Sequence, residues 1–292
     1  MPNITTSKDG TRIAFERSGT GPALILVDGA MCRRAFGPMA KIAPFFEPNF
    51  TVFRYDRRGR GDSGDTQPYA IEREIEDLAA LIREAGGSAS LLGLSSGAAL
   101  ALEAAASGLP IEKLALYEPP YTGPADGAAA NHEAHLKQLI AAKRRSDAVE
   151  YFMKDMVNVP AVFVLLMRVM FPMWSKLKAV AHTLPYDAAI LRGFRLPQER
   201  AAAIRVPTLA MAGDKTQPRL LDAIRLVAQT IPGAKLELLK GQTHVVDGKV
   251  LAPVVTAFLL DGGATLGARP RDIPARPGRA PGEAFPASGI RE

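Results

Sequence analysis

The chain has 292 residues, enough for one large domain with a sizeable core, and its composition is that of an ordinary globular protein. Its formal net charge is +6, of which two charges lie in residues 262–292, where five arginines stand against three acidic residues. The other charges are scattered and form no basic stripe interleaved with aromatic side chains. We therefore expect no nucleic-acid partner.

Neither a membrane span nor a disulfide framework is predicted. The longest apolar run, residues 161–167, ends at Arg168 and is much shorter than the roughly 20 residues that a membrane helix needs. Cys32 is the only cysteine, and no charged-then-apolar leader begins the chain. We expect a cytoplasmic protein with no membrane partner, in which Cys32 is a small buried hydrophobe and not a nucleophile.

Short apolar segments typical of buried strands alternate with helix-like segments over much of the chain. A turn pair, Asp9-Gly10, predicts an N-terminal hairpin, and the pair Gly86-Gly87 ends a helix whose apolar residues recur from residue 71 to residue 82. The other strands are expected at residues 23–27, 50–55, 90–92, 114–117, 206–212 and 235–239, and the other helices at 98–106, 220–231 and 249–260.

This alternation predicts an α/β fold, with a mostly parallel eight-stranded sheet and helices on both faces. The core comprises residues 1–120 and 201–260. Residues 121–200 carry helical stretches rich in methionine and aromatic residues, and are expected to form a helical cap inserted after the sixth strand. Most of these side chains should be core, and a minority should line a cavity. Residues 261–292, rich in Gly, Pro, Ala and Arg, predict a disordered tail.

The segment Gly93-Leu94-Ser95-Ser96-Gly97 joins a predicted strand to a predicted helix. In such a turn a G-x-S-x-G sequence holds the serine in a strained conformation with its hydroxyl exposed, and the flanking glycines avoid clashes. The Ser96 N–H then lies unpaired at a helix N-terminus, where an oxyanion would form. The alternative interpretation of the segment is a glycine- and serine-rich turn that has no chemistry.

The order of this segment, an acidic residue and a histidine on a late loop resembles the α/β-hydrolase superfamily over about residues 3–260. Residues 56–63 are similar to that family's D-x-R-G-x-G-x-S loop, which braces the site; a phosphate cradle is disfavoured because no Gly-Lys-Ser/Thr sequence follows. The resemblance implies that Ser95 is the nucleophile of a catalytic triad and that His244, after the last expected strand, is its base.

Two residues compete for the triad acid. Many family members carry an aspartate three residues after the glycine that ends the seventh strand, but here that position is Thr216, and Asp214 comes two positions early. Some relatives, including certain haloalkane dehalogenases, use a glutamate at the end of the sixth strand, where this chain has Glu118. Glu118 is slightly favoured because it needs no register shift. Otherwise Glu118 would pair with a neighbouring arginine and Asp214 would serve as a turn residue.

The oxyanion hole is expected from the Ser96 N–H and from the N–H of Ala30, with Met31 as its alternative. The family's usual His-Gly is Asp28-Gly29 here, and an ionised Asp28 facing the hole would weaken an oxyanion. Leu94 replaces a common histidine and suggests an apolar pocket floor.

No metal and no cofactor are expected. His132 and His135 have i, i+3 spacing but no cysteine or carboxylate motif near them, so a solvated helix face is the better interpretation.

These features favour a serine hydrolase of the carboxylic-ester type that cleaves an ester or thioester of a small apolar substrate. Acyl transfer, carbon–carbon cleavage or perhydrolysis would use the same residues, because the fold does not define the reaction. A catalytically weak ligand-binding protein with this fold is the alternative from another class. Among protein partners, a homodimer is left open.

Overall fold

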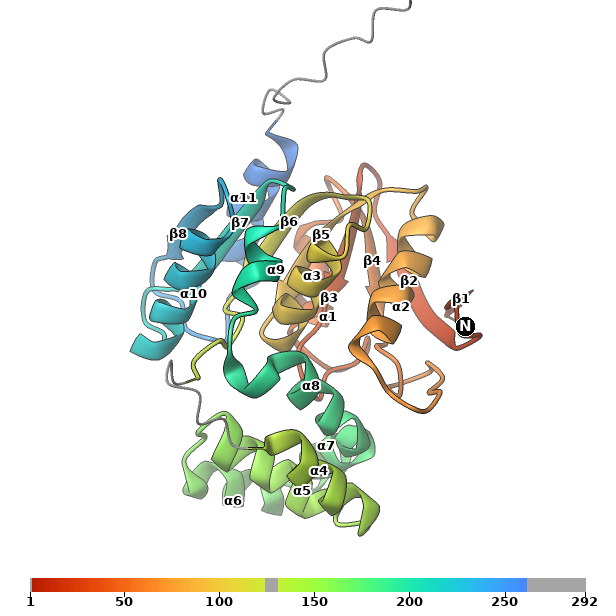
Figure 1. The fold of residues 1–292 in the computed structure, drawn as a ribbon, viewed down its shortest axis with the longest axis vertical. Coiled ribbons are helices and arrows are strands. Elements are labelled where there is room, and N and C mark those ends of the chain that lie inside the picture. The colour runs from red at the N-terminus through yellow and green to blue at the C-terminus, as the bar shows by residue number, and fades with distance from the viewer. Residues whose placement is uncertain (1, 124–130, 262–292) are drawn as a thin grey trace, which may run out of the picture. The chain divides into compact units, whose positions relative to one another are not determined.

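A computed structural model describes residues 2–123 and 131–261 of the chain (Figure 1). The strands are β1 (Asn3–Thr6), β2 (Arg12–Ser18), β3 (Ala23–Val27), β4 (Thr51–Tyr55), β5 (Ala89–Leu94), β6 (Ile111–Tyr117), β7 (Thr208–Gly213) and β8 (Lys235–Leu239). They form one eight-stranded sheet in the order β1-β2-β4-β3-β5-β6-β7-β8. β2 is antiparallel to its neighbours β1 and β4, and the pairs from β4 to β8 are parallel. The predicted mostly parallel sheet is confirmed.

Side chains of the central strands alternate between two apolar cores on opposite faces of the sheet. In β3, Leu24 and Leu26 belong to one core, while Ile25 and Val27 belong to the other. The helices α1 (Pro38–Ile42) and α11 (Gly248–Leu260) contribute to the first core, and α2 (Ile71–Glu84), α3 (Ser96–Ala106) and α10 (Pro218–Thr230) contribute to the second. Because both faces are covered, the central strands read as continuous apolar runs.

The segment between β6 and β7 is helical, as expected for an insertion after the sixth strand. Its helices are α4 (His132–Ala141), α5 (Arg145–Tyr151), α6 (Ala161–Val169), α7 (Phe171–Val180), α8 (Leu184–Leu191) and α9 (Gln198–Ala202). α4 to α7 gather below the sheet in Figure 1, and α8 and α9 pack against α3. The described residues up to Leu260 belong to one compact unit. The expected tail falls, except for Asp261, outside the described residues.

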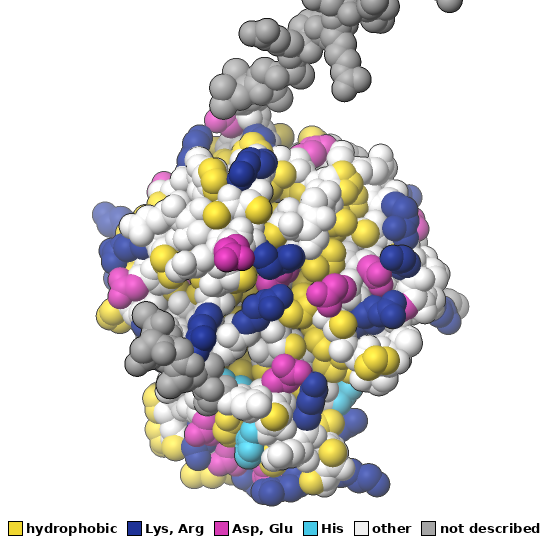
Figure 2. All heavy atoms as spheres, in the orientation of Figure 1, with side chains coloured by type: hydrophobic (Ala, Val, Ile, Leu, Met, Phe, Trp, Pro, Cys, Tyr) yellow, Lys and Arg dark blue, Asp and Glu magenta, His cyan; other side chains and the backbone are white. Residues whose placement is uncertain are grey.

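The apolar side chains of the insertion do not all pack inward as expected. Phe152, Met156 and Trp174 are buried, whereas Phe163, Met170 and Phe171 are at least half exposed. α6 is apolar on nearly every side, so its sequence has no polar face that would mark the solvent side. Across the two described stretches of chain, no helix has the length and apolar character needed to cross a bilayer. Figure 2 shows basic and acidic side chains interspersed over the face drawn.

Candidate active site

Ser95 lies in the sharp turn between β5 and α3, with φ 54° and ψ −125°, a strained conformation for a residue with a side chain. A Cβ on Gly93 would lie 2.5 Å from the Ala98 Cα, and one on Gly97 would lie 2.2 Å from the Val27 carbonyl oxygen. Real side chains do not tolerate such distances, so both flanking positions require glycine. The turn is therefore built as the pentapeptide predicts.

His244 follows β8, and its loop is fastened to the ends of two neighbouring strands. The Tyr117 hydroxyl donates to the Thr243 carbonyl at 2.5 Å, and a Cβ on Gly213 would lie 2.2 Å from the Gln242 carbonyl oxygen. The imidazole is about half exposed, and it lines the same cavity as Ser95. The late loop thus brings the expected base to the expected nucleophile.

Glu118, at the end of β6, is the carboxylate that contacts His244. Its Oε2 lies 2.7 Å from His244 Nδ1, and the side chain is fully buried. The Gly213 N–H donates to Oε1 at 2.9 Å and the Thr216 hydroxyl donates to Oε2 at 3.1 Å. Glu118 has φ 46°, a second strained residue at this edge of the sheet. With Glu118 ionised, Nδ1 carries the proton and Nε2 remains free as an acceptor.

Asp214 has a different contact. Its Oδ1 accepts the Gly241 N–H at 2.7 Å, and its own N–H donates to the Leu239 carbonyl at 3.1 Å. These bonds tie the end of β7 to the loop that leads to His244. The carboxylate is exposed and makes no hydrogen bond to the imidazole among the described contacts.

Several backbone N–H groups near Ser95 have no acceptor in the part of the chain that the structure describes, among them those of Ala30, Met31 and Ser96. Ser96 is the first residue of α3, where an N–H has no partner within the helix. Ala30 follows Gly29, whose Cβ, if present, would lie 3.4 Å from the Ser95 Cβ. Met31, the alternative donor, has φ 59° and is buried. Ala30 and Ser96 are thus available to bind a negative oxygen above the serine.

The cavity that contains Ser95 and His244 has a volume of about 320 Å³. Its apolar wall comes from the insertion and its polar wall from the start of α10. The insertion contributes Met156, Val157, Val159 and Phe194, and the α10 side contributes Lys215, Thr216, Gln217 and Arg219. One of the methionines singled out in the sequence, Met156, therefore lines the cavity.

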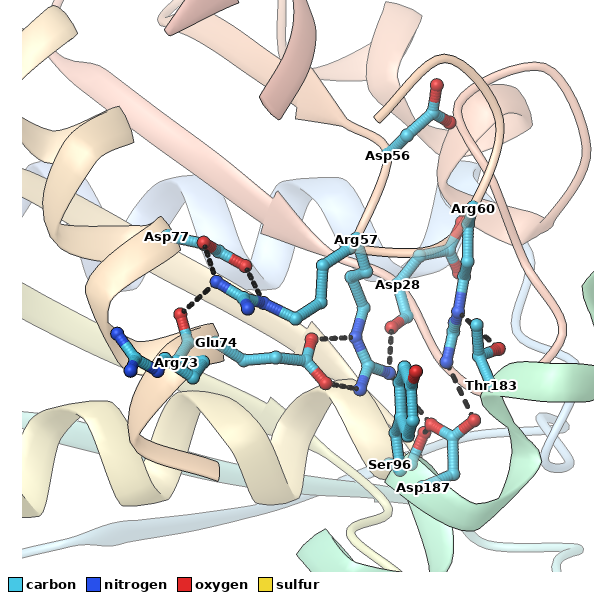
Figure 3. Close-up of polar contacts among 12 residues, drawn as sticks. Asp28, Asp56, Arg57, Arg60, Arg73, Glu74, Asp77, Ser96, Thr183 and Asp187 are labelled. Carbon is cyan, nitrogen blue, oxygen red and sulfur yellow. Dashed lines mark hydrogen bonds and ion pairs between the residues drawn. The ribbon is translucent and has the colours of Figure 1, made fainter. Parts of the chain in front are cut away.

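A cluster of buried charges joins the loop after β4 to α2 and α8 (Figure 3). Arg57, from the loop after β4, makes two hydrogen bonds to Glu74, at 2.7 and 2.8 Å, and one to Asp187 at 2.9 Å. Arg58 is paired with Asp77, so neither arginine uses Glu118 as its partner. The D-x-R-G-x-G-x-S loop thus braces the site. Sequence reasoning missed Asp187, because it lies on α8, 130 positions from Arg57, and belongs to no motif.

Asp28 is buried in the loop after β3, where Arg57 Nη1 donates to its backbone carbonyl at 3.4 Å and, among the described residues, no arginine donates to its carboxylate. Its Oδ1 accepts the Gly29 N–H at 3.0 Å. Its Oδ2 lies 2.5 Å from the position that a Cβ on Gly37 would occupy. Burial raises the pKa of Asp28 from its usual 3.8 to about 6, and the Gly29 N–H, Cys32, Arg60 and Arg57 offset part of the rise. Burial also raises the pKa of the Cys32 thiol, so the thiolate is disfavoured.

The contacts of His132 and His135 do not support a role as metal ligands. His132 Nδ1 is 2.8 Å from the Tyr151 hydroxyl, and His135 packs against the same ring. Over residues 2–123 and 131–261, no group of three or more potential metal ligands is present.

Asp28→Asn should increase the free energy of unfolding at pH 8 and leave it nearly unchanged at pH 4. A carboxyl whose pKa is raised in the folded state stabilises the fold below pH 3.8, and that stabilisation is lost as pH rises through about 6. An amide cannot ionise, so the gain at pH 8 should approach about 3 kcal/mol. Urea unfolding of the wild type and of Asp28→Asn at pH 4 and pH 8 measures the difference in free energy of unfolding. An equal difference at the two pH values would contradict the raised pKa of Asp28.

The matching family model, described as the alpha/beta hydrolase family, covers residues 24–254. An alpha/beta hydrolase from Sphaerobacter thermophilus has a similar solved structure, with TM-score 0.82, 49% identity, and coverage of 88% of this chain and 100% of that one. The enol-lactonase of Burkholderia xenovorans shares the fold, with TM-score 0.64 and 22% identity over 88% of this chain and 99% of that one.

A curated relative, the N-formylmaleamate deformylase of Pseudomonas putida, is 36% identical over 124 residues, which cover 40% of this chain and 45% of that protein. The aligned part is thus less than half of the relative's length. The family model, in contrast, spans both the strand that precedes Ala30 and the loop that carries His244. The chain belongs to the alpha/beta hydrolase family.

Proposed function

We propose that the protein is a serine hydrolase in which Ser95, His244 and Glu118 form the catalytic triad. The observation that carries this proposal is the 2.7 Å contact between His244 Nδ1 and the buried Glu118 carboxylate, in a loop that shares a cavity with Ser95. Glu118 is already held by Gly213 and Thr216, so it orients the imidazole without moving.

In this mechanism His244 Nε2 takes the proton of the Ser95 hydroxyl as the serine oxygen attacks the substrate carbonyl. The carbonyl oxygen becomes negative and is bound by the Ala30 and Ser96 N–H groups. His244 then donates its proton to the leaving group, and an acyl-enzyme on Ser95 remains. Water, deprotonated by His244, attacks the acyl-enzyme; the acid is released as His244 returns that proton to the Ser95 oxygen.

The cavity supports a substrate that has both an apolar part and a carboxylate. Lys215 and Arg219 line it, and neither is within ion-pair distance of a carboxylate in the described part of the chain. Arg219 is held by neutral acceptors: its Nε donates to Gln217 at 2.9 Å, and the Asn158 amide oxygen, turned toward it, accepts from both Nη atoms. The two positive charges therefore remain available for an anion.

This proposal modifies the purely apolar substrate expected from the sequence. The apolar wall, which includes Met156 and Phe194, suits a short hydrocarbon segment of the substrate. The Lys215 and Arg219 side chains suit a carboxylate at the far end of that segment. The relative from P. putida is named for N-formylmaleamate, a carboxylate by its name, and for removal of a formyl group. A small carboxylate-bearing ester, or an N-formyl amide, is the substrate class that fits both observations.

Ser95→Ala should abolish turnover of small activated esters and labelling by a fluorophosphonate probe. The hydroxyl is the attacking group, and its loss leaves the glycine-defined turn intact, so the melting temperature should stay within about 2 °C of the wild type. Intact-mass analysis after labelling, with Ser96→Ala as a second serine variant, identifies the modified residue. Labelling that persists in Ser95→Ala would exclude Ser95 as the nucleophile.

Glu118→Gln should lower kcat for an activated ester by roughly 10³- to 10⁴-fold, in line with the loss when the triad aspartate of a serine protease becomes asparagine. The amide retains the shape of the side chain but favours the wrong imidazole tautomer. Asp214→Asn is the matched control: its oxygen can still accept the Gly241 N–H, so kcat should change by less than about twofold. If Asp214→Asn caused the larger loss, the acid would be misassigned.

Lys215→Gln and Arg219→Gln should each lower kcat/KM for a dicarboxylic acid mono-ester by about three- to tenfold. The corresponding neutral ester of equal chain length should change by less than about twofold, because it presents no charge to either side chain. Arg225→Gln is the control, since Arg225 lies on the same helix and does not line the cavity. Equal losses for both esters would argue against a carboxylate subsite.

A further inference from the structure

Asp187, on α8 of the insertion, makes the contact between that segment and the residues around Ser95 (Figure 3). It is fully buried, and its Oδ1 accepts from the Ser96 hydroxyl at 2.9 Å and from Arg57 at 2.9 Å. Its Oδ2 accepts from Arg60 Nη2 at 2.7 Å. A single carboxylate thus holds the residue after the nucleophile and two arginines of the loop that follows β4.

Arg60 is held on three edges of its guanidinium. Besides the bond to Asp187, Nε donates to the Thr183 hydroxyl at 3.1 Å, and Nη1 donates to the Gly29 carbonyl at 2.7 Å. The guanidinium is planar and rigid, so fixing two edges from the insertion determines where the third edge points. That third edge is the one that binds the backbone of the oxyanion loop.

The Gly29 carbonyl belongs to the same peptide unit as the Ala30 N–H. Because a trans peptide is planar, its C=O and N–H point in opposite directions, and fixing one fixes the other. The Ala30 N–H therefore points away from Arg60, and no acceptor among the described residues occupies it. The Gly29 backbone lies close to the Ser95 side chain, as the 3.4 Å separation from its virtual Cβ shows.

We propose that Asp187 is a positioning residue for the oxyanion hole: by holding Arg60 it fixes the Gly29–Ala30 peptide, and by holding the Ser96 hydroxyl it steadies the second donor. This proposal rests on the proposed serine-hydrolase function. It also makes the insertion part of the catalytic geometry, since both Asp187 and Thr183 come from it. A shift of α8 would then change the alignment of the donor above Ser95 as well as the shape of the cavity.

The charges of the cluster show why Asp187 has no substitute. Arg57 and Arg60 are balanced by Glu74 and Asp187, all four being buried. Glu74 is already engaged with two nitrogens of Arg57, and Arg60 makes no ion pair with another carboxylate in the described part of the chain. Without Asp187 the Arg60 side chain is left with neutral acceptors only. It would then turn toward other polar groups and release the Gly29 carbonyl.

Asp187→Asn should lower kcat for a small activated ester by about tenfold or more, because a misaligned donor loses part of the 10²- to 10³-fold effect of one oxyanion-hole hydrogen bond. Rates are divided by the number of sites that a fluorophosphonate titrates, so that misfolded molecules do not count. KM should change by less than about twofold, and a trifluoromethyl ketone, which forms an oxyanion on Ser95, should bind about tenfold more weakly.

Asp77→Asn is the matched control, since Asp77 is an equally buried aspartate that makes two hydrogen bonds to an arginine, Arg58, at 2.7 and 2.8 Å. Its partner does not reach residues 28–30. Asp77→Asn should leave kcat per titrated site unchanged. If Asp187→Asn does not fold, Thr183→Val removes one acceptor of Arg60, and kcat per site should fall by about threefold.

A kcat per site in Asp187→Asn within about twofold of the wild type, or an equal loss in Asp77→Asn, would overturn the proposal. Hydrogen exchange of the peptide spanning residues 29–34 gives a readout that needs no turnover: exchange should rise in Asp187→Asn and not in Asp77→Asn. Unchanged exchange would overturn the proposal as well. A wild-type protein that fluorophosphonate does not label would contradict the proposed function, and the exchange data would still decide the role of Asp187.

Discussion

The turn between β5 and α3 has no space for a side chain at either glycine that flanks Ser95, and the geometry of the site depends on that constraint. Gly93 lies against the backbone of α3, and Gly97 lies against the end of β3. Ser95 is further fixed because its N–H donates to the Tyr117 carbonyl on the neighbouring strand at 3.0 Å. The strain at Ser95 persists because the surrounding backbone over-determines the turn.

The histidine loop depends on a similar close approach. Gly213 allows Gln242 to lie directly on the end of β7, and Asp214 binds the backbone of Gly241. Asp214 therefore has a place near the site without contacting the imidazole. The carboxylate that does contact it, Glu118, comes from the adjacent strand β6 and is fully buried. Its three hydrogen bonds, to Gly213, Thr216 and His244, satisfy the ionised form in that buried position.

The buried arginines place charges in a region where apolar side chains of similar volume would stabilise the fold at least as well. Desolvation of Arg57, Arg60, Glu74 and Asp187 offsets much of their mutual attraction, so such a cluster adds little net free energy of folding. The cluster does fix the orientation of its side chains, because each planar guanidinium donates hydrogen bonds in fixed directions to specific acceptor atoms. Arg60 and Arg57 also donate hydrogen bonds to the carbonyls of Gly29 and Asp28, respectively. The cluster thereby orients the backbone of the loop next to Ser95.

Local sequence was sufficient for the individual strands, the turn at Ser95 and the loop that carries His244. The period of the apolar residues and the positions of Gly86, Gly93 and Gly97 act over a few neighbouring residues, so their consequences can be read without the fold. The outward face of α6 could not be predicted, because a helix that is apolar on nearly every side does not record which side is solvated.

Tertiary structure alone decided which carboxylate meets His244 and which groups hold Arg60. Glu118 and His244 are 126 positions apart, and Arg60 and Asp187 are 127 apart. Such contacts depend on the order of strands in the sheet and on how α8 packs against α3, which no local pattern encodes. The sequence by itself offered a candidate nucleophile, a candidate base and two candidate acids. The fold determined which of them touch, because distance between side chains is a property of packing and not of spacing along the chain.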